Sequence, residues 1–402
     1  MHHRYTGEKM SDYKNDYNKF HYDRINLMVP QGKKEEIKKI AALRKMSVNE
    51  YIWSAVLKDM HDTDALPTID ISNRRYVGGK QSLLPFIRNS LKNISIRSIA
   101  DLFSGTGVVA GAFNAQNRIV ITNDILYSNY ICHYAWFSSE KYDEKMIREK
   151  LIQYNSLPIL HEENYVTENY AGRYFSCENA SKIGYIREDI ERLKINNEIN
   201  QREYALLLMS LLYATQHADV SRTIGHYMTF LKKNTKDGNL KLCMPLAPSP
   251  RINLGNQCYN IDASMLIKSM PPVDLLYIDP PYHRQYGEYY HVLESIAMWN
   301  KAPTYGDTRR IVTTKSNFSI KTKATRALAE IVEETAQRHK AKYILLSYNN
   351  DPRNNMQSID IMQILSRFGK TRVFNQEYPS FHGRNNKQNT DNKERLFLCV
   401  LQ

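Results

Sequence analysis

The sequence predicts an α/β fold built on a mainly parallel sheet, and three segments carry that prediction. Each begins with an apolar run typical of a buried strand and passes directly into glycine or polar residues. In open α/β sheets, ligands bind outside the carboxyl ends of the strands, so the three junctions should meet at one site. The segments are residues 99–111, 118–124 and 273–282.

The amino-terminal part differs from the rest of the chain. Residues 1–23 are rich in Tyr, Asn, Lys and His with little apolar content, which is typical of a mobile arm. Residues 24–29 alternate apolar and polar side chains and predict a short strand that ends at Pro30.

Two helices are predicted after this strand. They span about residues 33–44 and 48–60, and Ser47 and Glu50 have the spacing of a capping box at the start of the second. So short a strand-helix-helix segment cannot bury its apolar faces alone, so we expect it to pair with a second copy of itself. Residues 61–73 have the composition of a linker.

A glycine loop follows the first predicted strand of the sheet. Gly105 and Gly107 permit positive φ and a close backbone approach, and the helix that follows offers free N–H groups. The next glycine, Gly111, is four residues on, whereas the dinucleotide-binding pattern requires three. Asp124, at the end of the next strand, is suited to ribose hydroxyls, although a solvated strand-end acid is the alternative.

The segment Asp279-Pro280-Pro281-Tyr282 predicts a rigid turn after the third strand. Two prolines remove two backbone donors and fix φ twice. The Asp279 carboxylate and the Pro280 carbonyl could accept the two hydrogens of a planar amine, which localises its lone pair. With Tyr282 stacked on the ring, the turn suits alkylation of an exocyclic amino group. A proline-terminated strand with an incidental Asp and Tyr is the alternative.

Together these segments resemble the Dam-like, alpha-group adenine-specific DNA methyltransferases, which use S-adenosylmethionine. The resemblance covers about residues 74–402 and implies a Rossmann-like methyltransferase sheet. It rests on three motifs in the family's order: a lysine-containing segment at 75–87, the cofactor loop at 101–107 and the catalytic turn at 279–282.

The resemblance also implies roles for individual residues. Asp279, Pro280 and Tyr282 would be catalytic, acting on an adenine flipped out of the duplex. Lys80 would help hold the amino-acid end of the cofactor. The implied cofactor contacts are Tyr76, Gly79, Lys80, Asp101, Phe103, Gly105, Gly107, Asp124 for the ribose and Asp262 for the adenine.

Residues 24–60 resemble a ribbon-helix-helix module, in which two chains intertwine and place a two-stranded ribbon in the DNA major groove. The resemblance implies that Arg24, Asn26 and Met28 face the bases and that the module forms a homodimer. A helical extension packed on the catalytic domain is the alternative.

A long segment, about residues 140–255, separates the second strand from the third and exceeds what a doubly wound sheet needs. Target recognition is the expected role. Arg222, His226 and Lys232 lie where hydroxyl, basic and aromatic groups mix as on a DNA-facing surface, and Arg284 follows the catalytic turn. An ordinary amphipathic helix has the same mixture.

Composition favours a polyanionic partner, here double-stranded DNA. Lys and Arg number 55 against 42 Asp and Glu, which gives a net charge of +13. Basic residues between 384 and 395 are interleaved with polar ones suited to phosphate contacts. The five cysteines show no Cys-x-x-Cys spacing, so no metal site is expected.

The chain has no apolar run of about 18 residues and no signal peptide, so we expect no membrane span and a cytoplasmic, nucleoid-associated protein of bacterial, archaeal or phage origin. Further strands are predicted at 342–348, 371–378 and 394–401, the last two as an antiparallel hairpin typical of methyltransferase sheets.

The sequence predicts a site-specific DNA adenine methyltransferase, in a restriction-modification or epigenetic system and with a cognate endonuclease as a candidate partner. Three alternatives stay open. The chain could be an RNA guanine-N2 methyltransferase, because some such enzymes share the Asp-Pro-Pro-aromatic turn. It could be a DNA-binding regulator with an inactive methyltransferase domain. Cytosine N4 is a lesser alternative target.

Overall fold

The computed structural model describes residues 29, 33–43, 46–52, 66–217, 219–221, 223, 226–227, 238–282, 286–314, 316–377 and 393–402. The chain divides into two compact units, Met1–Ala65 and Leu66–Gln402. Among the described residues, no helix is long and apolar enough to cross a bilayer.

In the first unit, α2 spans Lys33–Leu43 and a second helical stretch covers residues 48–52. The predicted capping box is present: the Ser47 N–H donates to Glu50 Oε2 at 2.7 Å and the Glu50 N–H to Ser47 Oγ at 3.1 Å. The ribbon residues Arg24, Asn26 and Met28 lie outside the described residues, so the ribbon-helix-helix assignment stays a prediction.

The second unit is built on a seven-stranded sheet with the order β5-β3-β2-β6-β7-β9-β8. The first five strands in that order pair in parallel, whereas β9 is antiparallel to both β7 and β8. A mixed α/β fold with a mostly parallel sheet is therefore confirmed. The strands are β2 Ser98–Asp101, β3 Ile119–Asn123, β5 Gln257–Tyr259, β6 Val273–Ile278, β7 Ala341–Asn349, β8 Gly369–Glu377 and β9 Lys393–Leu401.

Strand order places the site. From β2 the chain continues outward to β3 and β5, and then returns to the other side of β2 to form β6 and β7. The order therefore reverses between β2 and β6, and ligands of such sheets bind outside the strand ends at this switch point. In register, Asp101 at the end of β2 is opposite Tyr277, two residues before Asp279.

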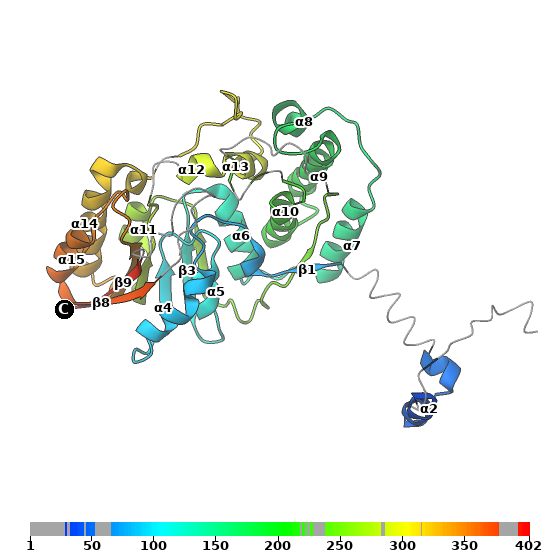
Figure 1. Cartoon of the computed structure of the whole chain (residues 1–402), viewed down its shortest axis with the longest axis horizontal. Helices are drawn as coiled ribbons and strands as arrows, with labels where there is room; N and C mark the ends of the chain where they lie inside the picture. The colour runs from blue at the N-terminus through cyan, green and yellow to red at the C-terminus, as the bar shows by residue number, and fades with distance from the viewer. Residues whose placement is uncertain are drawn as a thin grey trace, which may run out of the picture. The chain divides into compact units, whose positions relative to one another are not determined.

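Helices cover both faces of the sheet (Figure 1). Because β6 is buried on both faces, its side chains alternate between two hydrophobic clusters, with Leu275 and Tyr277 in one and Leu276 and Ile278 in the other. The second cluster includes α11 Ala263–Ser269, α14 Lys321–Gln337 and α15 Ser358–Ser366. The first includes α4 Leu84–Ser90, α5 Val108–Phe113, α6 Tyr127–Phe137, α7 Glu144–Asn155, α8 Tyr165–Tyr170, α9 Cys177–Ile195, α10 Gln201–Thr215 and α13 His291–Met298.

Much of the segment at 140–255 is core rather than surface. Every residue of α10 after Gln201 is buried, and the helix packs against α6 and α9. A helix on the surface would expose a polar face, whereas α10 is buried on all sides because other helices enclose it. DNA contacts from this segment must therefore come from outside α10.

Residues 66–73, which the sequence assigns to the linker, belong to the second unit. β1 Thr68–Ile69 pairs in parallel with β4 Met244–Pro245, and Leu66 and Ile69 are buried in the first cluster. The short β1–β4 pair ties the start of this unit to the far end of the 140–255 segment.

Candidate active site

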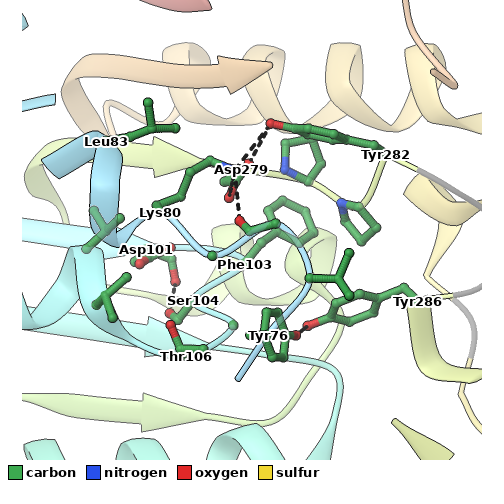
Figure 2. Close-up of a pocket in the computed structure, with 18 of the residues that line it drawn as sticks. Tyr76, Lys80, Leu83, Asp101, Phe103, Ser104, Thr106, Asp279, Tyr282 and Tyr286 are labelled. Atoms are coloured by element: carbon green, nitrogen blue, oxygen red, sulfur yellow. Dashed lines mark hydrogen bonds and ion pairs between the residues drawn. The ribbon is translucent and has the colours of Figure 1, made fainter. Parts of the chain in front are cut away.

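A cavity of about 260 Å³ opens at the carboxyl ends of β2 and β6. Residues of the lysine-containing segment, the glycine loop and the Asp-Pro-Pro-Tyr turn all line it, although they lie far apart in the sequence. Figure 2 shows Lys80, Asp279 and Tyr282 directed toward one another, with Asp101 and Ser104 beneath them. Two of the three junctions, those at 99–111 and 273–282, therefore line one cavity.

A buried ion pair joins two of these segments. Lys80 Nζ lies 2.8 Å from Asp279 Oδ2, and their side chains are only 8% and 15% exposed. Lys80 also donates to the Gly78 carbonyl at 3.3 Å, in a turn where Gly78 has a φ of 80°. Burial raises the pKa of Asp279, and the ammonium of Lys80 opposes that rise.

The Tyr282 side chain is fixed at both its hydroxyl and its ring. The hydroxyl lies 3.0 Å from Asp279 Oδ1 and 3.1 Å from Glu394 Oε1, and Lys80 donates to it at 3.4 Å. The ring packs edge-on against Tyr348 at a centroid distance of 4.5 Å. The turn therefore presents its acid and its aromatic side chain as one connected group.

The glycine loop needs its glycines. Gly105 and Gly107 have φ of 54° and 82°, and a Cβ on Gly107 would lie 3.2 Å from His133, Ile71 and Phe137. His133 Nε2 is 2.9 Å from the Gly105 carbonyl. Burial lowers the pKa of His133 to about 3, so the ring is neutral and donates this hydrogen bond.

Asp101 is buried at the end of β2 and lines the cavity. Its Oδ1 has no hydrogen-bond partner among the described residues. Burial raises its pKa well above the ordinary range, and the nearby charges of Asp279 and Asp124 add to the rise. An unpaired buried acceptor is costly to the fold, which suggests that a cationic or donor group completes it.

The Asp124 carboxylate is held by hydrogen bonds from neighbouring residues. Its carboxylate accepts from the N–H groups of Gly105 at 3.0 Å and Leu126 at 2.9 Å, and from the Tyr286 hydroxyl at 2.7 Å. The side chain thus ties the glycine loop to the end of β3. Burial raises the pKa of Asp124.

A second, smaller pocket adjoins the cavity and shares Phe103 with it. Asp124 and Asp262, predicted for ribose and adenine, both line this pocket. Asp262 also caps α11, because its Oδ1 accepts from the Ser264 N–H at 2.9 Å. Its cofactor role stays a prediction.

Three tyrosines, Tyr76, Tyr286 and Tyr290, form another part of the cavity wall. The Tyr76 ring stacks on Tyr290 at 4.4 Å and 4°, and its hydroxyl donates to Tyr286 at 2.6 Å. The Tyr290 hydroxyl in turn accepts from the Val77 N–H at 2.8 Å. These contacts position the segment that carries Lys80.

Glu394, at the start of β9, is a site residue that sequence reasoning missed. Glu394 is buried and contacts Tyr282 and Ser347, so it is not part of a phosphate-binding surface. The predicted phosphate contacts between 384 and 392 lie outside the described residues. A signal was present: Glu394 has the same parity as Leu396 and Leu398, which predicts that it faces inward.

Of the predicted DNA contacts, the structure describes His226. Its ring stacks on Tyr289, a cavity residue, at 5.0 Å and 26°, and burial lowers its pKa. Part of the 140–255 segment therefore reaches the wall of the cavity. Arg222, Lys232 and Arg284 lie outside the described residues.

A mostly parallel sheet whose switch point carries a glycine loop, a buried Lys–Asp pair and an Asp-Pro-Pro-Tyr turn defines a methyltransferase-type α/β enzyme. Comparison with known proteins gives the family. The family model described as D12 class N6 adenine-specific DNA methyltransferase matches residues 76–362. The chain belongs to this family and is thus a DNA adenine-N6 methyltransferase, as predicted.

Individual relatives agree. The type II methyltransferase M.NlaIII of Neisseria lactamica is 31% identical over 335 residues, which cover 78% of this chain and 96% of that protein. The type II methyltransferase M.FokI of Planomicrobium okeanokoites is 31% identical over 347 residues, with coverage of 80% and 52%. Modification methylase LlaI of Lactococcus lactis subsp. lactis is 33% identical over 350 residues, with coverage of 80% and 53%. The chain spans about half the length of the last two.

Proposed function

We propose that this enzyme methylates N6 of an adenine extruded from duplex DNA at one short sequence, with S-adenosylmethionine as methyl donor. The observation that carries the proposal is the Lys80–Asp279 pair at 2.8 Å, held beside the glycine loop at the switch point of the sheet. The order of the three motifs along the chain supports assignment to the Dam-like alpha group.

The residues at the switch point fit this cofactor. The unpartnered Asp101 Oδ1 would accept from its ammonium group, and the close-packed backbone at Gly105 and Gly107 would lie along its amino-acid end. Asp124 and Asp262, in the adjoining pocket, would hold the ribose and the adenine. Once bound there, S-adenosylmethionine supplies an electrophilic methyl group.

The catalytic turn would act on the target adenine. Asp279 and the Pro280 carbonyl accept the two N6 hydrogens, which localises the lone pair on the nitrogen. Tyr282 would stack on the extruded base, a contact worth about 1–3 kcal/mol that offsets part of the extrusion cost of a few kcal/mol. No covalent intermediate on the protein is required.

The test is base-resolved detection of modified bases in DNA from cells that express the chain, compared with cells that express Asp279→Ala. We expect N6-methyladenine within one short motif for the wild type and none for the variant. Modified cytosine, or no modified base in either DNA while both proteins bind S-adenosylmethionine, would contradict the proposal.

The segment at about 140–255 would recognise the target sequence, with His226 against the cavity wall as its described contribution. A cognate restriction endonuclease is the expected partner, because relatives carry the names of type II and modification methylases. Co-expression of a nuclease that cuts at the modified motif would test this: protected chromosomal DNA is the expected result.

Residues 24–60 would form a ribbon-helix-helix dimer that adds DNA affinity, with 1–23 as a mobile arm. So small a unit cannot bury its apolar faces alone, which supports a partner for it. Deletion of residues 1–60 tests the proposal. Conversion from dimer to monomer in light scattering and weaker DNA binding are expected, and an unchanged oligomeric state with unchanged affinity would refute it.

A further inference from the structure

Glu394 is a buried carboxylate at the cavity to which the reaction outlined above gives no role. Its side chain is 4% exposed, and its Oε1 accepts from Ser347 Oγ at 2.8 Å. The same oxygen lies 3.1 Å from the Tyr282 hydroxyl and 4.0 Å from Lys80 Nζ. Burying a carboxylate is unfavourable unless its surroundings compensate, so this placement calls for a physical reason.

Hydrogen-bond accounting at Tyr282 supplies the first reason. The tyrosine has one hydroxyl proton but faces two carboxylate oxygens, Asp279 Oδ1 at 3.0 Å and Glu394 Oε1 at 3.1 Å. A hydrogen bond from Tyr282 to Asp279 Oδ1 competes with the adenine amine for that oxygen. A hydrogen bond from Tyr282 to Glu394 leaves Asp279 Oδ1 to the substrate, while Lys80 keeps Oδ2.

Charge supplies the second reason. Lys80 neutralises Asp279, yet the adenine nitrogen becomes positive as its bond to the methyl group forms. The Lys80 ammonium and the carboxylates of Asp279 and Glu394 together carry one net negative charge. Such a site stabilises the developing positive charge better than the isolated Lys80–Asp279 pair.

We propose that Glu394 is a positioning residue for methyl transfer: it accepts the hydrogen bond of the Tyr282 hydroxyl, frees Asp279 Oδ1 for the adenine amine and offsets the charge of Lys80. This inference rests on the proposed function of Asp279 and Tyr282. It adds the last strand of the sheet to the groups that arrange the reacting atoms.

The experiment compares single-turnover methylation by the wild type and Glu394→Gln. Both S-adenosylmethionine and unmethylated DNA that contains the target motif are saturating. The rate should fall by about tenfold to a hundredfold, because the amide of Gln replaces the charged acceptor of the Tyr282 hydrogen bond by a weaker, neutral one and removes a negative charge from the site. The dissociation constants of both substrates should stay within about twofold, because Glu394 acts on the reacting nitrogen alone. Glu377→Gln, on neighbouring β8 and exposed, is the matched control and should leave the rate unchanged.

The pH profile separates positioning from simple packing. The titratable groups around Glu394 are Lys80, Tyr277, Asp279 and Tyr282. The charge of Glu394 adds to the raised pKa of Asp279, whose main cause is burial. Removing the charge of Glu394 therefore lowers the pKa of Asp279, and the reaction needs Asp279 in its ionised form. The acid limb of the rate profile should therefore move to lower pH in Glu394→Gln.

The outcomes are distinct. A wild-type protein that forms no N6-methyladenine would defeat the proposed function itself. An active wild type with an equal rate in Glu394→Gln, or a slower variant with an unmoved acid limb, would overturn the role of Glu394 alone. If Glu394→Gln does not fold, Ser347→Ala removes a hydrogen bond to the same oxygen, and its rate should fall about twofold to tenfold. An unchanged rate there would also overturn the inference.

Discussion

Removal of the Lys80 ammonium should expose how strongly the active site depends on its ion pair. At 2.8 Å and an effective dielectric constant of about 20, the Lys80–Asp279 attraction is roughly 6 kcal/mol before desolvation is subtracted. Removal of one partner of a buried pair typically costs about 3–5 kcal/mol, because the other charge is left uncompensated. We expect Lys80→Met to fall in this range when Asp279 is ionised.

The loss of folding stability in Lys80→Met should be larger at high pH than at low pH. Burial already raises the pKa of Asp279, and Lys80 holds it down, so Lys80→Met raises it further. A carboxyl whose pKa is higher in the folded state than in the unfolded state destabilises the fold at high pH, and this cost disappears as pH falls through the folded-state value. The stability deficit of Lys80→Met should thus shrink toward acid, and its methylation rate should require higher pH than the wild type.

Thermal melts and single-turnover rates across pH measure both effects. Near about pH 8 we expect Tm to be lower by roughly 4–7 °C. Lys80→Met combined with Asp279→Asn should be more stable than Lys80→Met alone, since no ion is left unpaired. Lys92→Met, an exposed lysine, is the control. An unshifted pH profile, or strictly additive effects in the double variant, would refute the reasoning.

Two further changes probe the cofactor side of the cavity. Gly107→Ala adds a Cβ that meets three side chains at 3.2 Å on a backbone with φ of 82°, so we expect a loss of about 2 kcal/mol or more in denaturant unfolding and weaker S-adenosylmethionine binding by calorimetry. Gly172→Ala, with φ of 70° and open space around it, should lose only about 1 kcal/mol and bind normally. Asp101→Asn removes a buried charge with a raised pKa, so Tm should rise at neutral pH while cofactor affinity falls about tenfold or more. A variant that binds as tightly as the wild type would show that Asp101 does not contact the cofactor.

The sequence predicts those parts of the site that are encoded locally. Asp101, Gly105, Asp279 and Tyr282 follow apolar strands directly, and parallel pairing of β2 and β6 then brings them together without further information. Sequence patterns do not show pairings between distant segments. The contact of Tyr286 with Asp124 and that of Glu394 with Tyr282 depend on three-dimensional packing, which no short motif records.

The burial of α10 escaped prediction for a related reason. Its segment was judged by its length between two strands, which suggests a surface insertion. The run of leucines within α10, from Leu206 to Leu212, is apolar around the whole helix and indicates a fully enclosed position. Length alone therefore gave the wrong weight to the part of the 140–255 segment that forms α10.

The position of β9 has a consequence for the order in which this enzyme acquires activity. β9 follows the other described strands in sequence, yet it lies inside the sheet, between β7 and β8. While residues 393–401 are still unpaired, β7 has an open edge and β8 lacks its only strand neighbour among the described strands. Contacts between residues as distant as Lys80, Tyr282 and Glu394 form slowly, because long loops must close first. A growing chain would therefore hold the cofactor loop and the catalytic turn well before Tyr282 gains its last partner, and competence to methylate should appear as the final strand pairs.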